Sequence, residues 1–370
     1  MSDELLGTGY IVPRALTIAR EFRGLTRTEL ARRANVTRQT IVNLETGETA
    51  TPTRVTVEMI AEALDVLPQL LGEEPTPPPP VEILHFRGGA RVTARSSAHL
   101  LARASVYGKV TDYLAAHCSR LPPDAFAKVD PSGDIEDVAA RVRRAWGVGA
   151  DAPIHSAVRL LERAGAFVGS FEGGEKGVDA YSWQSSRPLI LCNSDRESPT
   201  RVRFGLLHEA GHLILHRGRE TGDKQTEEEA NRFASAMLLP RRAFWQEFPR
   251  FGSRLNWAGM FEMKARWGAS VAAIVRRAYD LAIITPGQYK TACIGLSANG
   301  WRKREPGEPD VAEKPELAPS IAAMLAKHRP LTRELGLSPK ALSELVNADE
   351  SALIPPQNTV VRLKSPRRPS

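Results

Sequence analysis

The sequence has little cysteine. Its three cysteines, Cys118, Cys192 and Cys293, are odd in number, lie far apart and form no Cys-x-x-Cys pair. A disulfide framework needs paired cysteines, and a zinc site built on thiolates needs closely spaced ones. The sequence therefore argues against both, and we expect three reduced cysteines in the protein core.

Long apolar segments are also absent. No uninterrupted apolar run approaches the roughly 20 residues that a transmembrane helix requires. The N-terminus, Met1-Ser2-Asp3-Glu4, is acidic, whereas a signal peptide begins with basic residues followed by an apolar stretch. We therefore expect a cytoplasmic protein that has no membrane partner.

The chain is long enough for more than one domain. Its 370 residues, 42% of them hydrophobic, can form two or three separate cores. The net charge of +7 is compatible with nucleic-acid binding. The distribution of the charge decides this question, rather than its total.

Residues 13 to 72 carry the signals of five short helices. Gly24 ends the first helix, and Thr26 with Glu29 forms a capping box that starts the second. Thr37 caps the third helix, which Gly47 closes. The fourth and fifth are expected at residues 52–64 and 67–71. The second and third helices, joined by a turn at residues 35–36, form a helix-turn-helix.

In a helix-turn-helix the second helix enters the major groove by its N-terminal end. The residues expected to read base edges there are Thr37, Arg38, Gln39, Thr40 and Asn43. Four arginines are candidates for phosphate contacts, namely Arg20, Arg23, Arg27 and Arg33. A generic helical bundle with a basic surface would explain the charge but not the order of the capping signals.

Residues 25–31, 35–41 and 44–47 resemble the XRE (Cro and phage-repressor) family of helix-turn-helix domains. The resemblance covers nearly all of residues 12 to 72. It implies sequence-specific binding to a double-stranded DNA operator, usually by a homodimer on a palindromic site.

A proline-rich segment follows. Residues 75–80 are all proline except Thr76 and should extend as polyproline II. We interpret them as a semi-rigid spacer in preference to a proline-rich ligand for a partner. The expected division of the chain is a DNA-binding domain at 1–72, a linker at 73–98, a metallopeptidase domain at 99–305 and a C-terminal extension at 306–370.

The region before the central motif changes from helical to β-type patterning. Helices are predicted at about 98–118, 134–146 and 154–164, and short β-rich runs follow at 166–169, 180–183 and 188–192. These runs predict a small antiparallel sheet. Its edge either holds an extended peptide by strand addition or merely supports the next helix, and the sequence favours neither.

The stretch His208-Glu209-Ala210-Gly211-His212 combines two imidazoles and a carboxylate. Residues four apart share one face of a helix, so His208 and His212 can bind a single Zn²⁺, with Glu209 placed to take a proton from a bound water. Such a short match also arises by chance, most often as two surface histidines. Its position on a buried helix that begins at Ser198-Pro199 favours the zinc site.

A third ligand is expected from the helix predicted at about 226–239. It contains Glu227, Glu228 and Glu229, and its apolar stripe places Glu227 and Asn231 at the buried edge, which favours Glu227. The metzincin pattern fails because Leu215 and Gly218 stand where it needs Gly and His. We expect His216 and Asn231 to support the ligands from behind, or His216 to be simply structural.

Residues 207–216, 227–234 and 238–240 resemble the ImmA/IrrE family of zinc metallo-endopeptidases, and the likeness extends roughly from 135 to 305. It implies that His208, His212 and Glu227 hold the zinc. It also implies cleavage of a bacterial repressor-type regulator. One departure is Leu239, where the family commonly has Met.

The expected fold is mainly α and multidomain. It combines a five-helix XRE-type domain with an α+β zincin-like domain that has a small sheet, and a partly helical C-terminal extension that ends in a disordered basic tail. The leading functional hypothesis is an operator-binding regulator fused to a zinc endopeptidase. The alternatives are an antitoxin that binds a cognate toxin through a protease-like domain, and a metal-sensing repressor. The intact motif and Glu227 favour retained metal chemistry.

Overall fold

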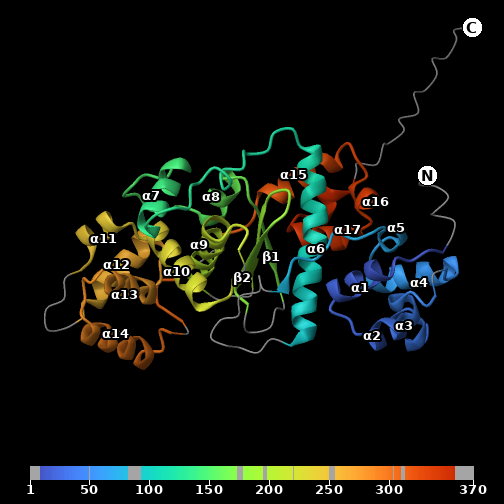
Figure 1. The fold of residues 1–370 in the computed structure, drawn as a ribbon, viewed down its shortest axis with the longest axis horizontal. Coiled ribbons are helices and arrows are strands. Elements are labelled where there is room, and N and C mark those ends of the chain that lie inside the picture. Colours follow the sequence, from blue (N-terminus) through green and yellow to red (C-terminus); the bar gives the residue numbers. More distant parts are fainter. Residues whose placement is uncertain are drawn as a thin grey trace, which may run out of the picture.

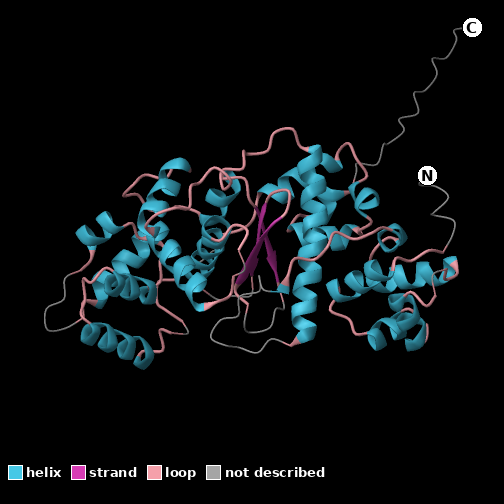
Figure 2. Ribbon diagram, in the orientation of Figure 1, coloured by secondary structure: helices cyan, strands magenta, loops and turns pink. Residues whose placement is uncertain are grey.

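The computed structural model describes residues 9–49, 51–81, 93–172, 178–194, 198–219, 221–249, 255–302, 304–309 and 313–354. Within these ranges the chain is mainly helical, and three short strands lie between two groups of helices (Figure 1, Figure 2). The expected disordered basic tail lies outside the described residues. No described helix is long and apolar enough to span a membrane.

Five N-terminal helices form the predicted helix-turn-helix unit. The capping box of Thr26 and Glu29 is present, Thr37 caps the third helix, and Gly47 closes it with a left-handed φ of 79°. The structure thus confirms the capping signals on which the prediction was based. The helices are α1 (Pro13–Phe22), α2 (Arg27–Arg33), α3 (Arg38–Thr46), α4 (Arg54–Leu64) and α5 (Pro68–Gly72).

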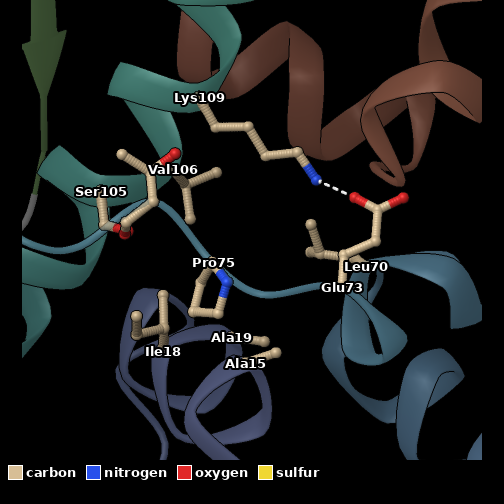
Figure 3. A pocket seen from close by; sticks show the side chains of 10 residues that line it. Ala15, Ile18, Ala19, Leu70, Glu73, Pro75, Ser105, Val106 and Lys109 are labelled. Carbon is tan, nitrogen blue, oxygen red and sulfur yellow. Dashed lines mark hydrogen bonds and ion pairs between the residues drawn. The ribbon is translucent and has the colours of Figure 1, made fainter. Parts of the chain in front are cut away.

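The N-terminal unit packs directly against the long helix α6 (Ala94–His117), principally through α1. His99 Nδ1 lies 2.8 Å from the carbonyl oxygen of Glu21, and Arg95 donates to the carbonyl of Gly24 at 2.6 Å. Lys109 pairs with Glu73 at 2.7 Å beside a small pocket lined by α1, α6 and the segment from Leu70 to Thr76 (Figure 3). The start of the predicted spacer therefore lies on α6 and does not hold the N-terminal unit away from it.

The sheet is mixed, so the prediction of an antiparallel sheet was wrong. Its strands are β1 (Phe167–Phe171), β2 (Ala180–Gln184) and β3 (Pro188–Asn193), in the order β1-β3-β2. The short turn after Gln184 makes β2 antiparallel to β3, pairing Ser182 with Ile190. β1 instead joins the other edge of β3 and runs parallel to it, pairing Val168 with Ile190. Consecutive strands β1 and β2 are therefore separated by β3.

The two faces of the sheet belong to two different hydrophobic cores. Phe167, Tyr181 and Leu191 pack into a core with α1, α6 and the C-terminal helices. Val168 and Ile190, from the opposite face, pack into a core with the helices that follow β3. The alternation of side chains along a strand produces this division.

The second core contains the helices on the other side of the sheet. Two of them, α9 (Pro199–Leu215) and α10 (Lys224–Leu238), pack along each other. The others are α7 (Ile135–Ala145), α8 (Ala157–Arg163), α11 (Arg241–Glu247), α12 (Trp257–Trp267), α13 (Val271–Asp280) and α14 (Pro286–Ala298).

The C-terminal helices return to the first core. Leu67 N–H donates to the carbonyl of Gly336 at 2.9 Å, and Arg23 pairs with Glu344 at 3.2 Å, so this segment contacts the helix-turn-helix unit directly. Leu331, Leu342 and other apolar residues are buried there. The elements are α15 (Leu317–Ala326), α16 (Leu331–Leu335), α17 (Pro339–Val346) and the 3₁₀ helix η3 (Glu350–Leu353).

Candidate metal centre and DNA-binding surface

Helix α9 carries the His-Glu-x-x-His motif and is anchored at its N-terminal half. Ser198 is the N-cap residue and Pro199 the first helical residue, as predicted. The carboxylate of Glu308 accepts hydrogen bonds from the N–H and the hydroxyl of Thr200, at 3.2 and 3.0 Å. Arg203 forms an ion pair with Glu313 at 3.2 Å. These contacts fix the first turn of the helix that carries the motif.

Helix α10 supplies the facing carboxylates. It begins at Lys224, two residues before the predicted start, because Asp223 caps it through the N–H groups of Gln225 and Thr226. Gly211 allows the two helices to approach closely, since a Cβ there would lie 3.1 Å from Phe233 Cδ1 and 3.3 Å from Ala230 Cα. The missing side chain thus allows the middle of α10 to lie against the motif.

Three possible ligands converge between α9 and α10. Glu227 Oε1 lies 3.2 Å from His212 Nε2, and Glu227 Oε2 lies 3.5 Å from His208 Nε2. The two Nε2 atoms are 3.0 Å apart. One ligand atom from each of the three residues lies within 4.8 Å of the others. Two imidazoles and one carboxylate are a donor set that suits Zn²⁺.

Both histidines are held from behind through Nδ1. His208 Nδ1 lies 3.1 Å from Asn231 Oδ1, and because an amide oxygen only accepts, Nδ1 carries the proton and Nε2 presents its lone pair. Two Nε2 lone pairs that face each other beside a carboxylate need a shared cation. The residues present therefore fit a divalent metal.

His212 is supported by a longer chain. Its Nδ1 lies 3.0 Å from His216 Nδ1, and His216 Nε2 lies 2.9 Å from Glu229 Oε2. Hydrogen bonds from Gln225 and His216 lower the pKa of the Glu229 carboxyl, and burial lowers the pKa of His216. A neutral His216 that donates from Nε2 to an ionised Glu229 has no proton on Nδ1 and accepts there. The proton between the two Nδ1 atoms therefore belongs to His212, and His212 Nε2 carries none.

Glu209 points toward the sheet. Its side chain is almost fully buried, with 2% of the residue exposed, and Ser182 Oγ on β2 donates to its Oε2 at 2.7 Å. A buried carboxylate needs such a donor, because burial without one is costly. The carboxylate expected to accept a proton is therefore held by a residue of the neighbouring strand.

The structure brings together the motif residues and Glu227, and it places Asn231 and His216 directly behind the two histidines. Of the other two glutamates, the side chain of Glu228 is 62% exposed, whereas Glu229 contacts His216. The sequence analysis missed the contacts of Ser182 and Glu229. The alternation of β2 was a usable signal for Ser182, since it puts Ser182 on the face opposite Tyr181.

Four of the five expected DNA-reading residues lie on α3, and Thr37 is its N-cap residue. Thr37, Arg38 and Gln39 are exposed, while Thr40 and Asn43 are half-buried. Thr37 Oγ1 accepts from the N–H of Thr40 at 3.0 Å, so its hydroxyl is engaged as the helix cap. The side-chain amides of Gln39 and Asn43 are 2.7 Å apart. The N-terminal end of α3 is exposed, and its contact with a DNA groove stays a prediction.

Two of the arginines proposed for phosphate contacts have other roles. Arg20 is buried, pairs with Glu45 at 2.5 Å and donates to the carbonyl of Leu25 at 2.9 Å. Arg23 pairs with Asp65 at 2.5 Å and donates to the carbonyl of Leu64 at 2.7 Å. Both side chains thus bind acidic groups distant in sequence, and their contact with phosphates stays a prediction. Arg33 is exposed, and Arg27 is partly exposed while pairing with Glu45.

Comparison with known families agrees with both regions. The model of the IrrE N-terminal-like domain, a peptidase family, matches residues 161–279 and so includes β1 to β3, α9 and α10. A helix-turn-helix family model matches residues 16–71, which include α2 and α3. No curated protein matched the sequence significantly. The chain therefore carries an XRE-type helix-turn-helix DNA-binding domain followed by an ImmA/IrrE-like domain of a metallopeptidase family.

Proposed function

We propose that this chain is a transcriptional regulator in which a zinc-dependent endopeptidase is fused to an operator-binding domain. The peptidase cleaves a bacterial regulatory protein of the repressor type. The DNA-binding domain acts as a homodimer on double-stranded DNA, and Thr37, Arg38, Gln39, Thr40 and Asn43 contact the bases. The domain limits that we propose remain 1–72, 73–98, 99–305 and 306–370.

The observation that carries the proposal is the convergence of His208, His212 and Glu227. Their ligand atoms meet between two buried helices, and each imidazole is oriented through Nδ1 by a polar partner. A module that only binds a partner has no need for such a donor set. The same reasoning gives Asn231 and His216 a role in orienting the metal ligands.

His208, His212 and Glu227 would hold the metal, and Glu209 is the general base. Bound zinc would lower the pKa of a water toward about 7 and polarise the scissile carbonyl. Glu209 takes a proton from the attacking water and later delivers it to the leaving amine. Water adds to the carbonyl carbon, the carbon–nitrogen bond breaks, and an acid and an amine are formed.

The free edge of β2 supports strand addition as the way in which a substrate is held. β2 pairs only with β3 among the described strands, and it packs against α9. An extended peptide beside β2 would gain main-chain hydrogen bonds and would lie next to Glu209. The strands could either hold a substrate or merely support α9. The position of the β2 edge next to Glu209 favours substrate binding.

The test combines metal analysis with a cleavage assay. The purified full chain and the Glu209→Gln variant are analysed for zinc and then incubated with the proteins encoded beside it. We expect about one zinc per chain in both proteins, and cleavage of a neighbouring regulator by the wild type alone. Asn231→Asp is not a suitable inactive control, since it changes the partner of a ligand, whereas Glu209→Gln removes only the base.

Other outcomes would reject the proposal. If the wild type holds no zinc and cuts no neighbour but forms a stable complex with one of them, the chain is an antitoxin or a similar binding regulator. If zinc binds and changes operator affinity without any cleavage, the chain is a metal-sensing repressor.

A further inference from the structure

Ser182 stands between the edge of the sheet and the carboxylate of Glu209. Its Oγ donates to Glu209 Oε2 at 2.7 Å and lies 3.3 Å from the carbonyl oxygen of Glu209. Both residues are buried, with 5% and 2% of their surface exposed. Tyr181, the preceding residue, points to the opposite face and donates to the carbonyl of Leu100 on α6 at 3.0 Å. The strand therefore gives Ser182 a single direction for its hydroxyl.

The main chain of Ser182 points in a different direction. Asn193 N–H donates to the carbonyl of Asp179 at 2.9 Å, and Ser185 N–H donates to the carbonyl of Arg187 at 3.0 Å. Hydrogen-bonded and non-hydrogen-bonded pairs alternate along an antiparallel ladder, so Tyr181 and Trp183 are the residues of β2 that bond to β3. The N–H and C=O of Ser182 consequently face away from β3, toward the free edge.

We propose that Ser182 is a positioning residue that links substrate binding to the general base. This inference rests on the proposed function. The N–H and C=O of Ser182 pair with the peptide that adds to β2. The Ser182 hydroxyl holds Oε2 of Glu209, so that Oε1 takes the proton of the attacking water. The substrate class is accordingly an extended segment of a polypeptide, because a folded helix cannot pair with a strand edge.

A hydroxyl at this position fixes which oxygen of the carboxylate acts. Without it, Glu209 loses the donor that orients Oε2, and the carboxylate rotates about its terminal bond, a torsion with a broad energy profile. A misplacement of about 1 Å in a catalytic group can cost roughly 100-fold in rate. Because the backbone of β2 is unchanged in a Ser182→Ala variant, substrate affinity should be retained.

The experiment uses the full chain with zinc and four variants, Ser182→Ala, Ser182→Thr, Glu209→Gln and the double variant Ser182→Ala/Glu209→Gln. Ser185→Ala is the matched control, since the Ser185 hydroxyl lies in the same hairpin but contacts Asp112 at 3.1 Å. Zinc affinity and Tm are measured first. Cleavage of fluorescently labelled casein then gives kcat and KM, and calorimetric titration with acetohydroxamic acid gives a Kd that does not depend on turnover.

We expect Ser182→Ala to lower kcat by about 10- to 100-fold while KM stays within about threefold. Ser182→Thr and Ser185→Ala should remain close to the wild type, and zinc affinity should be the same in every variant. Hydroxamate binding should be weakened by Ser182→Ala and by Glu209→Gln, with no further loss in the double variant, as expected for two groups that act as one unit.

Additive losses in the double variant, or a change in KM without a change in kcat, would overturn the proposal. A wild type that binds zinc and hydroxamate but cuts neither casein nor a neighbouring regulator would refute the peptidase function, while the hydroxamate cycle would still decide whether Ser182 acts through Glu209. A chain that binds no zinc overturns both.

Discussion

The chain from Glu229 through His216 to His212 makes a quantitative prediction about metal affinity. His216→Phe keeps the size and the planarity of the ring but removes the acceptor of the His212 Nδ1 proton. A buried donor without a partner costs about 1–3 kcal/mol. Since a tenfold change in affinity corresponds to about 1.4 kcal/mol, this cost equals a loss of roughly 5- to 150-fold in zinc affinity.

A second estimate agrees with this range. Groups that orient metal-binding histidines typically contribute about 10- to 100-fold in metal affinity. Glu229→Gln should have a smaller effect than His216→Phe, because an amide oxygen still accepts from His216 Nε2 and only the charge is lost. Glu228→Gln is the matched control, since Glu228 is on the same helix turn with its side chain 62% exposed.

The assay is competition for zinc against a chromophoric chelator at pH 7, with circular dichroism to verify the fold. The expected order of affinity is wild type and Glu228→Gln, then Glu229→Gln, then His216→Phe. If folded His216→Phe bound zinc within twofold of the wild type, His216 would be only a packing residue and the proton assignment above would be wrong.

Three further predictions concern the framework and the DNA. Lys264→Met leaves the carboxylates of Glu305 and Glu308 buried without their cation, and it should lower the free energy of unfolding by about 3–5 kcal/mol. Arg276→Met breaks an exposed ion pair and should lower the free energy of unfolding by less than about 0.5 kcal/mol. Burial alone would raise the pKa of Glu308, but hydrogen bonds from Lys264 and Thr200 hold this pKa below its ordinary 4.5. The ionised carboxylate therefore stabilises the fold above pH 4.5, and this contribution is lost as the pH falls through the lowered pKa. The Tm of Glu308→Gln should accordingly fall less on acidification than the Tm of the wild type. Arg38→Ala should weaken binding to a selected operator by about 1–3 kcal/mol in a fluorescence titration and relax its sequence preference, a result contradicted by equal losses on random DNA.

Local signals explain what could be predicted of the fold. Capping residues act on N–H groups within three residues of themselves, so Thr26 and Thr37 located their helices from the sequence alone. Pro199 at the first helical position located the start of α9 in the same local way. The same chemistry at Thr285 and Gln288 forms a capping box that starts α14.

Contacts between distant residues explain what could not be predicted. Arg20 meets Glu45, and Glu308 meets Thr200, which lies 108 residues earlier, and neither pairing leaves a trace in local patterning. Strand order has the same cause, since nothing within β1 shows that it pairs with β3. In the metal centre, helical spacing predicted His208 with His212, and the apolar stripe predicted Glu227. For Ser182 the alternation along β2 indicates only the face of the sheet, and its contact with Glu209, like that of Glu229 with His216, required the tertiary fold.

The arrangement of the two cores limits what the metal centre can act on. The helix-turn-helix unit packs on α6, on one face of the sheet, whereas α9 and α10 lie on the other face (Figure 1). The sheet therefore separates the folded helix-turn-helix unit from Glu209, so the proposed peptidase would cut another molecule in preference to its own DNA-binding domain. The two sides meet in consecutive residues of β2, because Tyr181 bonds to α6 and Ser182 bonds to Glu209.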